Sequence, residues 1–238
     1  MFKLKNLNEL GTTTLRRKAL YIAEAGLQAI DTTFLVNKAI DIRSQNHIIV
    51  SGVPWRTDRK GKIYFVGVGK CATAAAVAVE KALGDRLSAG IVLDVCEPYL
   101  VSKRLRFFGC THPFPSQKNV QASLEVADFL KKVTADDLII FVISGGGSTL
   151  LCLPESKNCT EEQMIMKRLF AVGAAISEIN TVRKHLSLLR GGQLARCAYP
   201  ARSIALIFSD VPGNDIQYVA SGPTVKEFDG DSQGPEIF

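Results

Sequence analysis

Residues 138–151 read LIIFVISGGGSTLL, an apolar run that ends at three consecutive glycines between Ser144 and Ser148. A buried strand gains from a side chain at every position, whereas glycines cost backbone entropy and pack nothing. Bare backbone at the end of a strand therefore indicates that something must approach the main chain closely. We predict that this loop binds an anion, because its amides and those of a helix starting near Ser148 would form a positive concavity.

Further apolar runs alternate with helical patterns on both sides of this stretch. The sequence predicts strands at 62–67, 90–95, 104–109, 138–143 and 203–209, and helices near 15–30, 70–83, 120–130, 166–174 and 181–197, the last around a Gly-Gly break. Residues 47–62 read as an extended segment and a turn. Apolar strands separated by helices indicate an α/β fold with a parallel sheet covered on both faces. We therefore expect the residues just after 67, 143 and 209 to converge at the carboxyl edge of the sheet.

Composition restricts the classes of function. The chain has 238 residues, a net charge of +6 and a scattered distribution of Lys and Arg, which favours an anionic small molecule over a nucleic acid. Its six cysteines lack C-x-x-C spacing, which indicates a reducing compartment and no structural zinc. The sequence has no apolar segment as long as a membrane span and no signal-peptide core, so we expect a cytoplasmic protein without membrane contact.

The stretch FVGVGKCATAAA places Gly67, Gly69 and Lys70 at the end of a predicted strand. It is close to the G-x-G-x-x-A fingerprint of dinucleotide-binding proteins, and Asp94 ends the next strand about where an acid that binds ribose would lie. A nicotinamide-dependent dehydrogenase is therefore one interpretation, and a tight turn with an exposed lysine is another. Lys70 favours a transferable phosphate, because a dinucleotide pyrophosphate needs no side-chain cation at that position.

The triple-glycine stretch, Ser144, Gly145, Gly146, Gly147 and Ser148, matches neither of two common motifs. It is no Walker A loop, because G-x-x-x-x-G-K-[ST] is absent, and no nucleophile elbow, because Val142 replaces the first glycine of G-x-S-x-G. A flexible turn is the alternative to an anion site, but ordinary turns seldom need three glycines.

Two further segments carry polar residues beside glycines. In NTVRKHLSLLRGGQLA, Asn180, Arg183 and Lys184 precede Gly191-Gly192. Such a charge cluster is usually a solvated surface, but Asn180 and the Gly-Gly interruption here favour an anion-binding helix end more than usual, and both interpretations stay open. On a helix Arg183 would share a face with Ser187. His47, His112 and His185 have no visible metal partner and are interpreted as structural.

In FSDVPGNDIQYVASGPT, Ser209 and Asp210 directly follow the last strand. Asp210 could bind magnesium, accept a proton from a substrate hydroxyl or cap a helix, and its position does not separate these roles. No set of metal ligands can be named.

Five segments together, VGVGKCATA, THPFPS, VISGGGSTLL, EINTVRKHLSLLRGGQLA and SDVPGNDIQYVASGPT, resemble in the same order the glycerate 2-kinase family, whose carboxyl half is the MOFRL domain. The resemblance runs from about Leu15 to Thr224. It implies a Rossmann-like three-layer sandwich and ATP-dependent phosphorylation of the 2-hydroxyl of D-glycerate with Mg²⁺. Residues 1–238 would then be the amino-terminal kinase domain, and the MOFRL domain would be absent from this chain.

The resemblance also implies roles for individual residues. Lys70 would stabilise charge on the transferring phosphoryl group, Ser144 to Ser148 would hold phosphate or carboxylate, Arg183 and Lys184 would add positive charge, and Asp210 would lie at the metal or hydroxyl. The chain departs from the family pattern at Ser116 and Asn214, where aspartates are usual.

The expected absence of the second domain suggests a fragment, a truncated isoform or a degenerate gene product that is inactive alone. Self-association into a homo-oligomer is compatible with the sequence. Two other functions remain open: an NAD(P)H-dependent hydroxypyruvate or hydroxy-acid reductase, and a regulatory module that binds phosphosugars.

Overall fold

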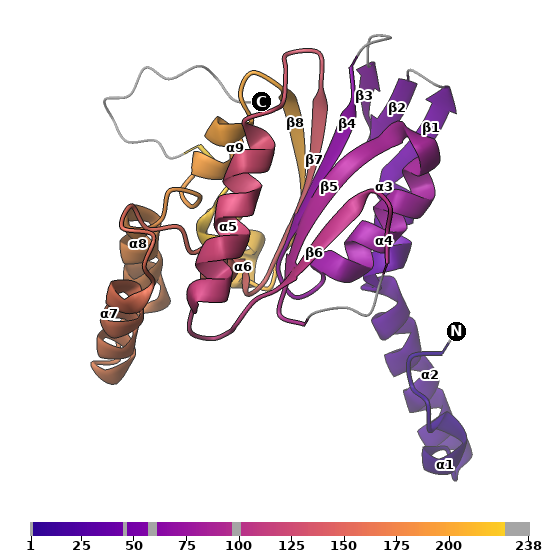
Figure 1. Ribbon diagram of the computed structural model, residues 1–238. Coiled ribbons are helices and arrows are strands. Elements are labelled where there is room, and N and C mark those ends of the chain that lie inside the picture. The colour runs from indigo at the N-terminus through magenta and orange to yellow at the C-terminus, as the bar shows by residue number, and fades with distance from the viewer. Residues whose placement is uncertain (1, 45–46, 57–60, 97–100, 227–238) are drawn as a thin grey trace.

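Figure 1 shows the computed structural model, which describes residues 2–44, 47–56, 61–96 and 101–226. Its main sheet has five parallel strands in the order β6-β5-β4-β7-β8. They are β4 (Ile63–Val68), β5 (Leu87–Asp94), β6 (Leu105–Gly109), β7 (Leu138–Ser144) and β8 (Arg202–Phe208). All five predicted strands are present, and the α/β class with a mainly parallel sheet is confirmed. The strand order reverses direction between β4 and β7, which makes this pair the topological switch point.

Helices cover both faces of the main sheet, so the molecule has three layers (Figure 1). On β7, Ile139, Phe141 and Ile143 pack into the core beneath α5 (Gln117–Leu130) and α9 (Gln193–Ala198). The alternate residues Leu138, Ile140 and Val142 pack on the opposite side with α3 (Thr32–Ala39) and α4 (Ala72–Leu83). A strand that is buried on both sides has no polar face, which explains why the sequence of β7 is apolar throughout.

A second, three-stranded antiparallel sheet lies beside the α3–α4 layer. It consists of β1 (Ile40–Ser44), β2 (His47–Val50) and β3 (Val53–Arg56). Ile40, Ile48 and Val50 join the core that contains α4. The sequence predicted only an extended segment and a turn at 47–62, of which residues 57–60 lie outside the described part. β1 was not expected, because it is only five residues long and most of its side chains are at least partly exposed.

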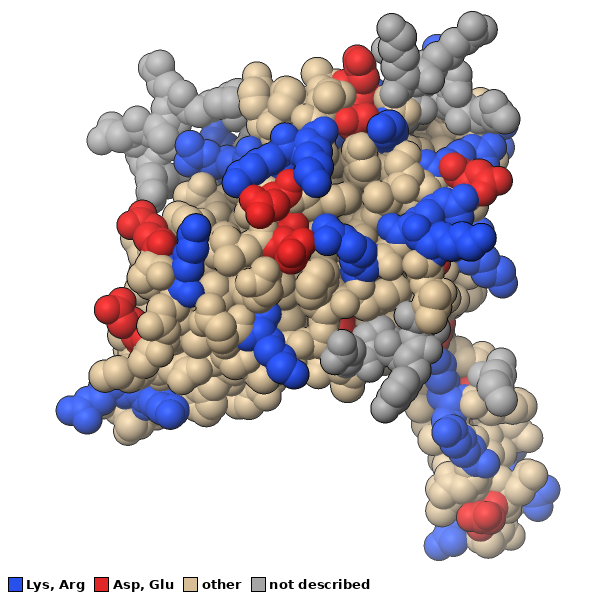
Figure 2. Space-filling view, in the orientation of Figure 1, with Lys and Arg blue, Asp and Glu red and all other residues tan. Residues whose placement is uncertain are grey.

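The amino-terminal helices project from the body as an arm (Figures 1 and 2). They are α1 (Leu7–Leu10) and α2 (Thr14–Ala29), and the side chain of Thr13 caps α2 by accepting a hydrogen bond from the backbone N–H of Arg16 at 3.2 Å. The predicted helix near 15–30 is therefore present, but its apolar positions face solvent. Leu15, Ile22 and Ile30 are 79%, 75% and 69% exposed.

The remaining helices follow β7 and lead into β8. They are α6 (Gly147–Leu150), α7 (Thr160–Ala171) and α8 (Ile176–Leu186). Elsewhere, a 3-10 turn at Gly84–Arg86 joins α4 to β5, and two more, Pro212–Asn214 and Val219–Ser221, follow β8. The helix predicted at 166–174 begins earlier, at Thr160, and the one predicted at 181–197 is two helices, α8 and α9. They are separated at Gly191 and Gly192, which have φ values of 56° and 78°. Within the described ranges, no helix combines the length and apolarity that crossing a bilayer requires.

Candidate anion-binding site

The loops after β4 and β7 meet at the switch point of the sheet. The backbone N–H of Lys70 donates to the carbonyl oxygen of Gly145 at 3.0 Å. Gly69 has a φ of +120°, and a Cβ at that position would lie only 2.5 Å from the carbonyl oxygen of Ser144. The close approach of the two loops thus depends on glycine at 69. The expectation that these two strand ends converge is confirmed.

Each glycine of the triple-glycine loop (Gly145, Gly146 and Gly147) makes room for a different neighbour. A Cβ at Gly145 would collide with the carboxylate of Asp210. At Gly146, which has a φ of +87°, a Cβ would lie 3.2 Å from Cε of Lys70 and 3.5 Å from Cδ2 of His112. At Gly147 it would lie 2.6 Å from Cβ of Ala220. The side chains of Lys70 and His112 therefore lie beside Gly146, and the carboxylate of Asp210 lies beside Gly145.

The helix that follows the loop is a single turn, Gly147–Leu150, and it is wholly buried. The side chain of Ser148 shares a 2.8 Å hydrogen bond with Ser221, whose hydroxyl donates to Oδ1 of Asn180 at 2.9 Å. All three side chains are buried. Ser148 and Asn180 thus fix the triple-glycine loop from the buried interior, through their hydrogen bonds to Ser221. The sequence marks Ser221 only as part of a small-residue loop, and its contacts were not predicted because its partners are distant in the chain.

Arg183 on α8 is only 8% exposed, contrary to the solvated position that is usual for a charge cluster. Burial lowers the pKa of its guanidinium, and the nearby charge of Arg190 lowers it further. Its Nε has no hydrogen-bond partner among the described residues. Arg183 is therefore a buried cation whose hydrogen bonding an anion would complete. Ser187 does not share its helical face, because α8 ends at Leu186.

A buried ion pair lies behind Arg183. Arg190 Nη2 contacts Glu162 Oε1 at 2.7 Å, and the two side chains are 0% and 1% exposed. Arg190 also donates to the carbonyl oxygen of Arg183 at 3.0 Å. This network was not predicted, because Glu162 and Arg190 belong to separate segments with no shared pattern. Lys184, the other predicted cation, is half-buried, and neither Arg183 nor Lys184 lines the cavity described below.

Ser209 and Asp210 follow β8 on the other side of the triple-glycine loop. Asp210 is exposed, whereas the Oγ of Ser209 accepts a hydrogen bond from the backbone N–H of Val211 at 3.2 Å. The part of the chain that the structure describes has no group of three or more His, Cys, Asp or Glu side chains that could hold a metal ion. Asp210 is a single carboxylate beside the loop, and Mg²⁺ in phosphoryl-transfer sites is commonly held by one or two carboxylates and the substrate phosphates.

A cavity of about 770 Å³ extends from these loops to the α3 side of the sheet. Lys70, Ser144, Gly145, Ser209 and Asp210 line its polar end. Apolar residues line its other walls: Leu35 and Val36 of α3, and Leu206 and Phe208 of β8. Small-molecule sites have this size and this combination of an apolar wall with few convergent polar groups.

Gly67 and Asp94, which support the dinucleotide interpretation in the sequence, do not lie where that interpretation requires them. Gly67 lies inside β4, paired with Val92 and Val142, so the loop begins at Gly69. Asp94 is 5% exposed, and its carboxylate accepts hydrogen bonds from the backbone N–H groups of Thr73 at 2.9 Å and Val95 at 2.6 Å. Its two oxygens therefore hold the first turn of α4 and the end of β5, and Asp94 lines neither of the two cavities described in this section.

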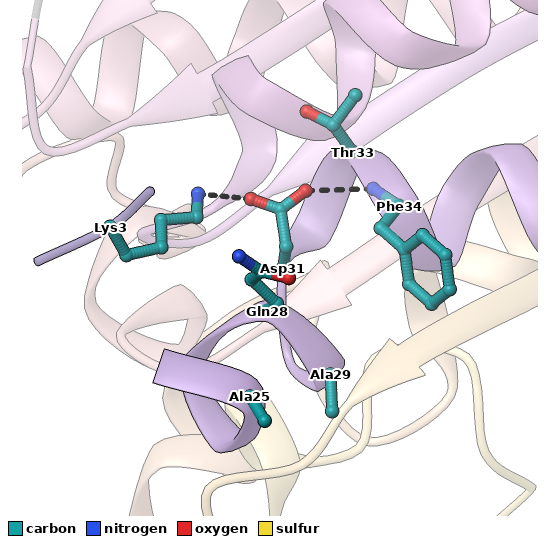
Figure 3. Close-up of a pocket in the computed structure, with 7 residues that line it drawn as sticks. All are labelled: Lys3, Ala25, Gln28, Ala29, Asp31, Thr33 and Phe34. Carbon is teal, nitrogen blue, oxygen red and sulfur yellow. Dashed lines mark hydrogen bonds and ion pairs between the residues drawn. The ribbon is translucent and has the colours of Figure 1, made fainter. Parts of the chain in front are cut away.

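A second, smaller pocket of about 550 Å³ lies where α2 meets α3 (Figure 3). Lys3 and Asp31 form an ion pair there, and Asp31 also accepts a 2.8 Å hydrogen bond from the backbone N–H of Phe34, which caps α3. These charged groups are satisfied by one another and by the helix end. The pocket lies on the arm and contains none of the loop residues at the switch point, so we interpret it as structural.

A protein-family model described as "Domain of unknown function (DUF4147)" matches residues 18–237 of the chain. Among curated proteins, one from Agrobacterium vitis that carries the provisional name hydroxypyruvate reductase is 41% identical over 180 residues, which are 75% of this chain and 41% of that protein. A glycerate 2-kinase from Pyrococcus horikoshii is 35% identical over 214 residues, which are 90% of this chain and 47% of the relative.

The crystal structure of the PH0495 protein from Pyrococcus horikoshii OT3 matches with a TM-score of 0.81 at 34% identity. The match covers 91% of this chain and 48% of that one. The chain thus spans about half the length of the relatives that it matches.

Proposed function

We propose that this chain binds ATP for the phosphorylation of D-glycerate to 2-phosphoglycerate. The premise is that the chain belongs to the DUF4147 family, which is the amino-terminal domain of glycerate kinases. The observation that carries the proposal is the junction at Gly146, where an ammonium and a bare backbone loop lie together at the switch point of a parallel sheet. Parallel α/β sheets bind ligands at this point. A lysine beside free loop amides is suited to phosphate.

The cavity supports a nucleotide as the ligand. Its polar end would hold the phosphates, and the apolar walls formed by Leu35, Leu206 and Phe208 would hold the base. A volume of about 770 Å³ is adequate for this purpose. In this arrangement the phosphates would lie nearest Lys70, at the junction of the two loops.

The chemistry of phosphoryl transfer agrees with the residues present. The reaction needs positioning and stabilisation of charge more than covalent participation of the protein. Lys70 would stabilise negative charge on the transferring group, and Arg183 would add a buried positive charge on the α8 side. Asp210 lies across the loop, where it would accept the proton of the 2-hydroxyl or contribute a ligand to Mg²⁺. When bound, Mg²⁺ would neutralise charge on the phosphates.

We further propose that residues 1–238 are one half of the active site and that a carboxyl-terminal MOFRL domain provides the other half. Relatives about twice as long as this chain support this view. The site would then be a cleft between domains, a common position for ligand sites. A homo-oligomer and a cytoplasmic location are also part of the proposal.

The reductase name among the relatives makes a hydroxy-acid reductase the second candidate. The position of Asp94 counts against it, because this carboxylate is only 5% exposed and is held by two backbone N–H groups at α4 and the end of β5. A phosphosugar-binding module would use the same loops without phosphoryl transfer.

Calorimetric titration of the chain with Mg-ATP, with NADH and with a sugar phosphate discriminates among the three. We expect saturable binding of Mg-ATP only. Saturable binding of NADH without a response to ATP would support the reductase, and tight binding of the sugar phosphate alone would support the regulatory module. For the reaction itself, ³¹P NMR of D-glycerate incubated with Mg-ATP and the protein joined to its second domain should show 2-phosphoglycerate, and 3-phosphoglycerate would refute the assigned position of transfer.

A further inference from the structure

His112 lies at the triple-glycine loop, although its sequence context gave no reason to place it in a binding site. Its Cδ2 atom and the Cε atom of Lys70 approach the same residue, Gly146, where a Cβ would lie 3.5 Å and 3.2 Å from them. The imidazole is exposed. A ligand that contacts the loop at Gly146 would therefore lie near Lys70 and His112, two side chains that can each carry a positive charge.

The segment that carries His112 is fixed by a buried asparagine of α5. Asn119 is 0% exposed, and its Nδ2 donates to the carbonyl oxygens of Thr111 at 2.9 Å and Thr149 at 3.0 Å. Its Oδ1 accepts a hydrogen bond from the backbone N–H of Thr111 at 3.0 Å. On the other side of His112, the hydroxyl of Thr149 donates to the carbonyl oxygen of Pro113 at 3.2 Å. Thr111 is thus joined to α6 through Asn119, and Pro113 is joined to α6 directly.

The charged groups around His112 are cationic. Burial, Lys70 after β4 and Arg183 of α8 all lower the pKa of its imidazole below the ordinary value of 6.5. The triple-glycine loop adds no charge, and Lys167 of α7 lies over the ring of Phe114 at 5.8 Å. Asp210 lies beside Gly145, and no carboxylate is among the described groups that shift this imidazole. At neutral pH His112 is therefore uncharged between two cations.

We propose that His112 is a further anion-binding residue of this site and that it takes up a proton from solvent when a phosphate-bearing ligand binds to the triple-glycine loop. The inference rests on the proposed function, since it assigns a second contact to the same phosphate. An anion beside the imidazole offsets the repulsion from Lys70 and Arg183 and favours the charged ring. The protonated ring then donates a charge-assisted hydrogen bond to a phosphate oxygen.

The direction of the pH dependence follows from linkage. Ligand binding raises the pKa of His112, so the ligand binds more tightly to the protonated form. Below the pKa of the free protein the ring is already charged, and above the pKa of the complex it is neutral in both states. Proton uptake is therefore greatest between these two values, and affinity weakens as pH rises across that interval.

The titration of the imidazole C–H signals by NMR tests the inference directly. The chain has three histidines, and the variants His112→Gln, His185→Gln and His47→Gln assign them, so that the titration of the wild type can be interpreted even if one variant does not fold. We expect saturating ATP or pyrophosphate to raise the pKa of His112 by about one unit. His185, which is exposed on α8 with its Nδ1 2.8 Å from the carbonyl oxygen of Thr181, is the internal control and should shift much less.

Calorimetry in two buffers of different ionisation enthalpy gives the number of protons taken up. The phosphates of the ligand contribute equally for every variant, so the difference between wild type and His112→Gln isolates the imidazole. His185→Gln should match the wild type. If ATP binds while the pKa of His112 stays unchanged, or if wild type and His112→Gln take up the same number of protons, the inference is overturned and the proposed function stands. If neither ATP nor pyrophosphate binds at any pH, both are overturned.

Discussion

The backbone N–H of Lys70 donates a 3.0 Å hydrogen bond to the carbonyl oxygen of Gly145. This contact joins the loops that follow the two central strands, β4 and β7. It places the side chain of Lys70 against Gly146 and leaves Gly145 facing Asp210. A cation and an acid are thus held on opposite sides of one loop by the backbone that both strands provide.

Replacing Lys70 by methionine should weaken ATP binding. The substitution keeps an unbranched side chain but removes the ammonium, and a hydrogen bond to a charged group is worth about 1.5–3 kcal/mol, or roughly 10- to 150-fold in affinity. Calorimetric titration with Mg-ATP would measure the loss. Lys81→Met, at an exposed lysine in the last turn of α4, is the matched control and should bind ATP as the wild type does. Equal affinity in the two variants would remove Lys70 from the site.

Gly69→Ala should destabilise the fold, because its φ of +120° is strained for alanine and the new Cβ would lie 2.5 Å from a backbone oxygen. We expect a loss of about 3 kcal/mol in the free energy of unfolding. The same substitution at Gly26, where nothing lies within 4 Å of the new Cβ, should instead stabilise α2 by about 0.5–1 kcal/mol. Urea unfolding measures whether each variant gains or loses free energy of unfolding. Similar changes in the two variants would contradict the strained geometry at Gly69.

Breaking the ion pair between Arg190 and Glu162 should destabilise the chain strongly. Arg190→Met leaves the carboxylate of Glu162 buried without its partner, which costs about 3–5 kcal/mol. The exposed pair between Arg106 and Glu125 provides a control, since Arg106→Met should cost at most about 1 kcal/mol. Thermal or urea unfolding would rank the two variants. If they lost the same stability, the pair at Arg190 would not be dehydrated as described.

Alkylation should distinguish the cysteines, all six of which are free thiols. Burial raises the pKa of Cys110 to about 12, and burial together with the carboxylate of Glu162 raises the pKa of Cys152 still further. Few thiolates form at these positions near neutral pH, and the thiolate is the reactive form. Mass spectrometry after brief iodoacetamide treatment should therefore find Cys96, which is exposed, labelled first. Labelling of Cys110 and Cys152 should require denaturant, and their rapid modification in the native chain would contradict their burial.

The sequence predicted the part of the fold that depends on local pattern. Each strand of the main sheet contains a run of mainly apolar residues, and a helical pattern separates most of them, so the layers and the convergence of 69–70 with 144–147 could be anticipated. The small sheet could not be anticipated, because its first strand is short and largely exposed. A helical pattern in the sequence shows which side of a helix is apolar, but it does not show what packs against that side. Among the described residues, the apolar positions of α2 face solvent.

The candidate site was predictable where glycines mark bare backbone and where Lys70 and Asp210 directly follow predicted strands. Gly69 and the triple-glycine loop stand out because glycine is costly in these positions without a structural need. The approach of His112, the support from Ser221 and the hydrogen bonds that occupy Asp94 depend on side-chain contacts between segments far apart in the chain. Spacing within a single sequence does not encode such contacts.

The three loops around Gly145 come from the ends of β4, β7 and β8, and β7 pairs with the other two strands only in the folded sheet. An unfolded chain scatters these loops, so a polyanion would recognise the native state alone. By mass action, such a ligand at 100 times its Kd would add about 2.7 kcal/mol to the free energy of unfolding. A rise in melting temperature with ATP concentration would therefore show that the site is occupied and also that the carboxyl edge of the sheet is correctly folded.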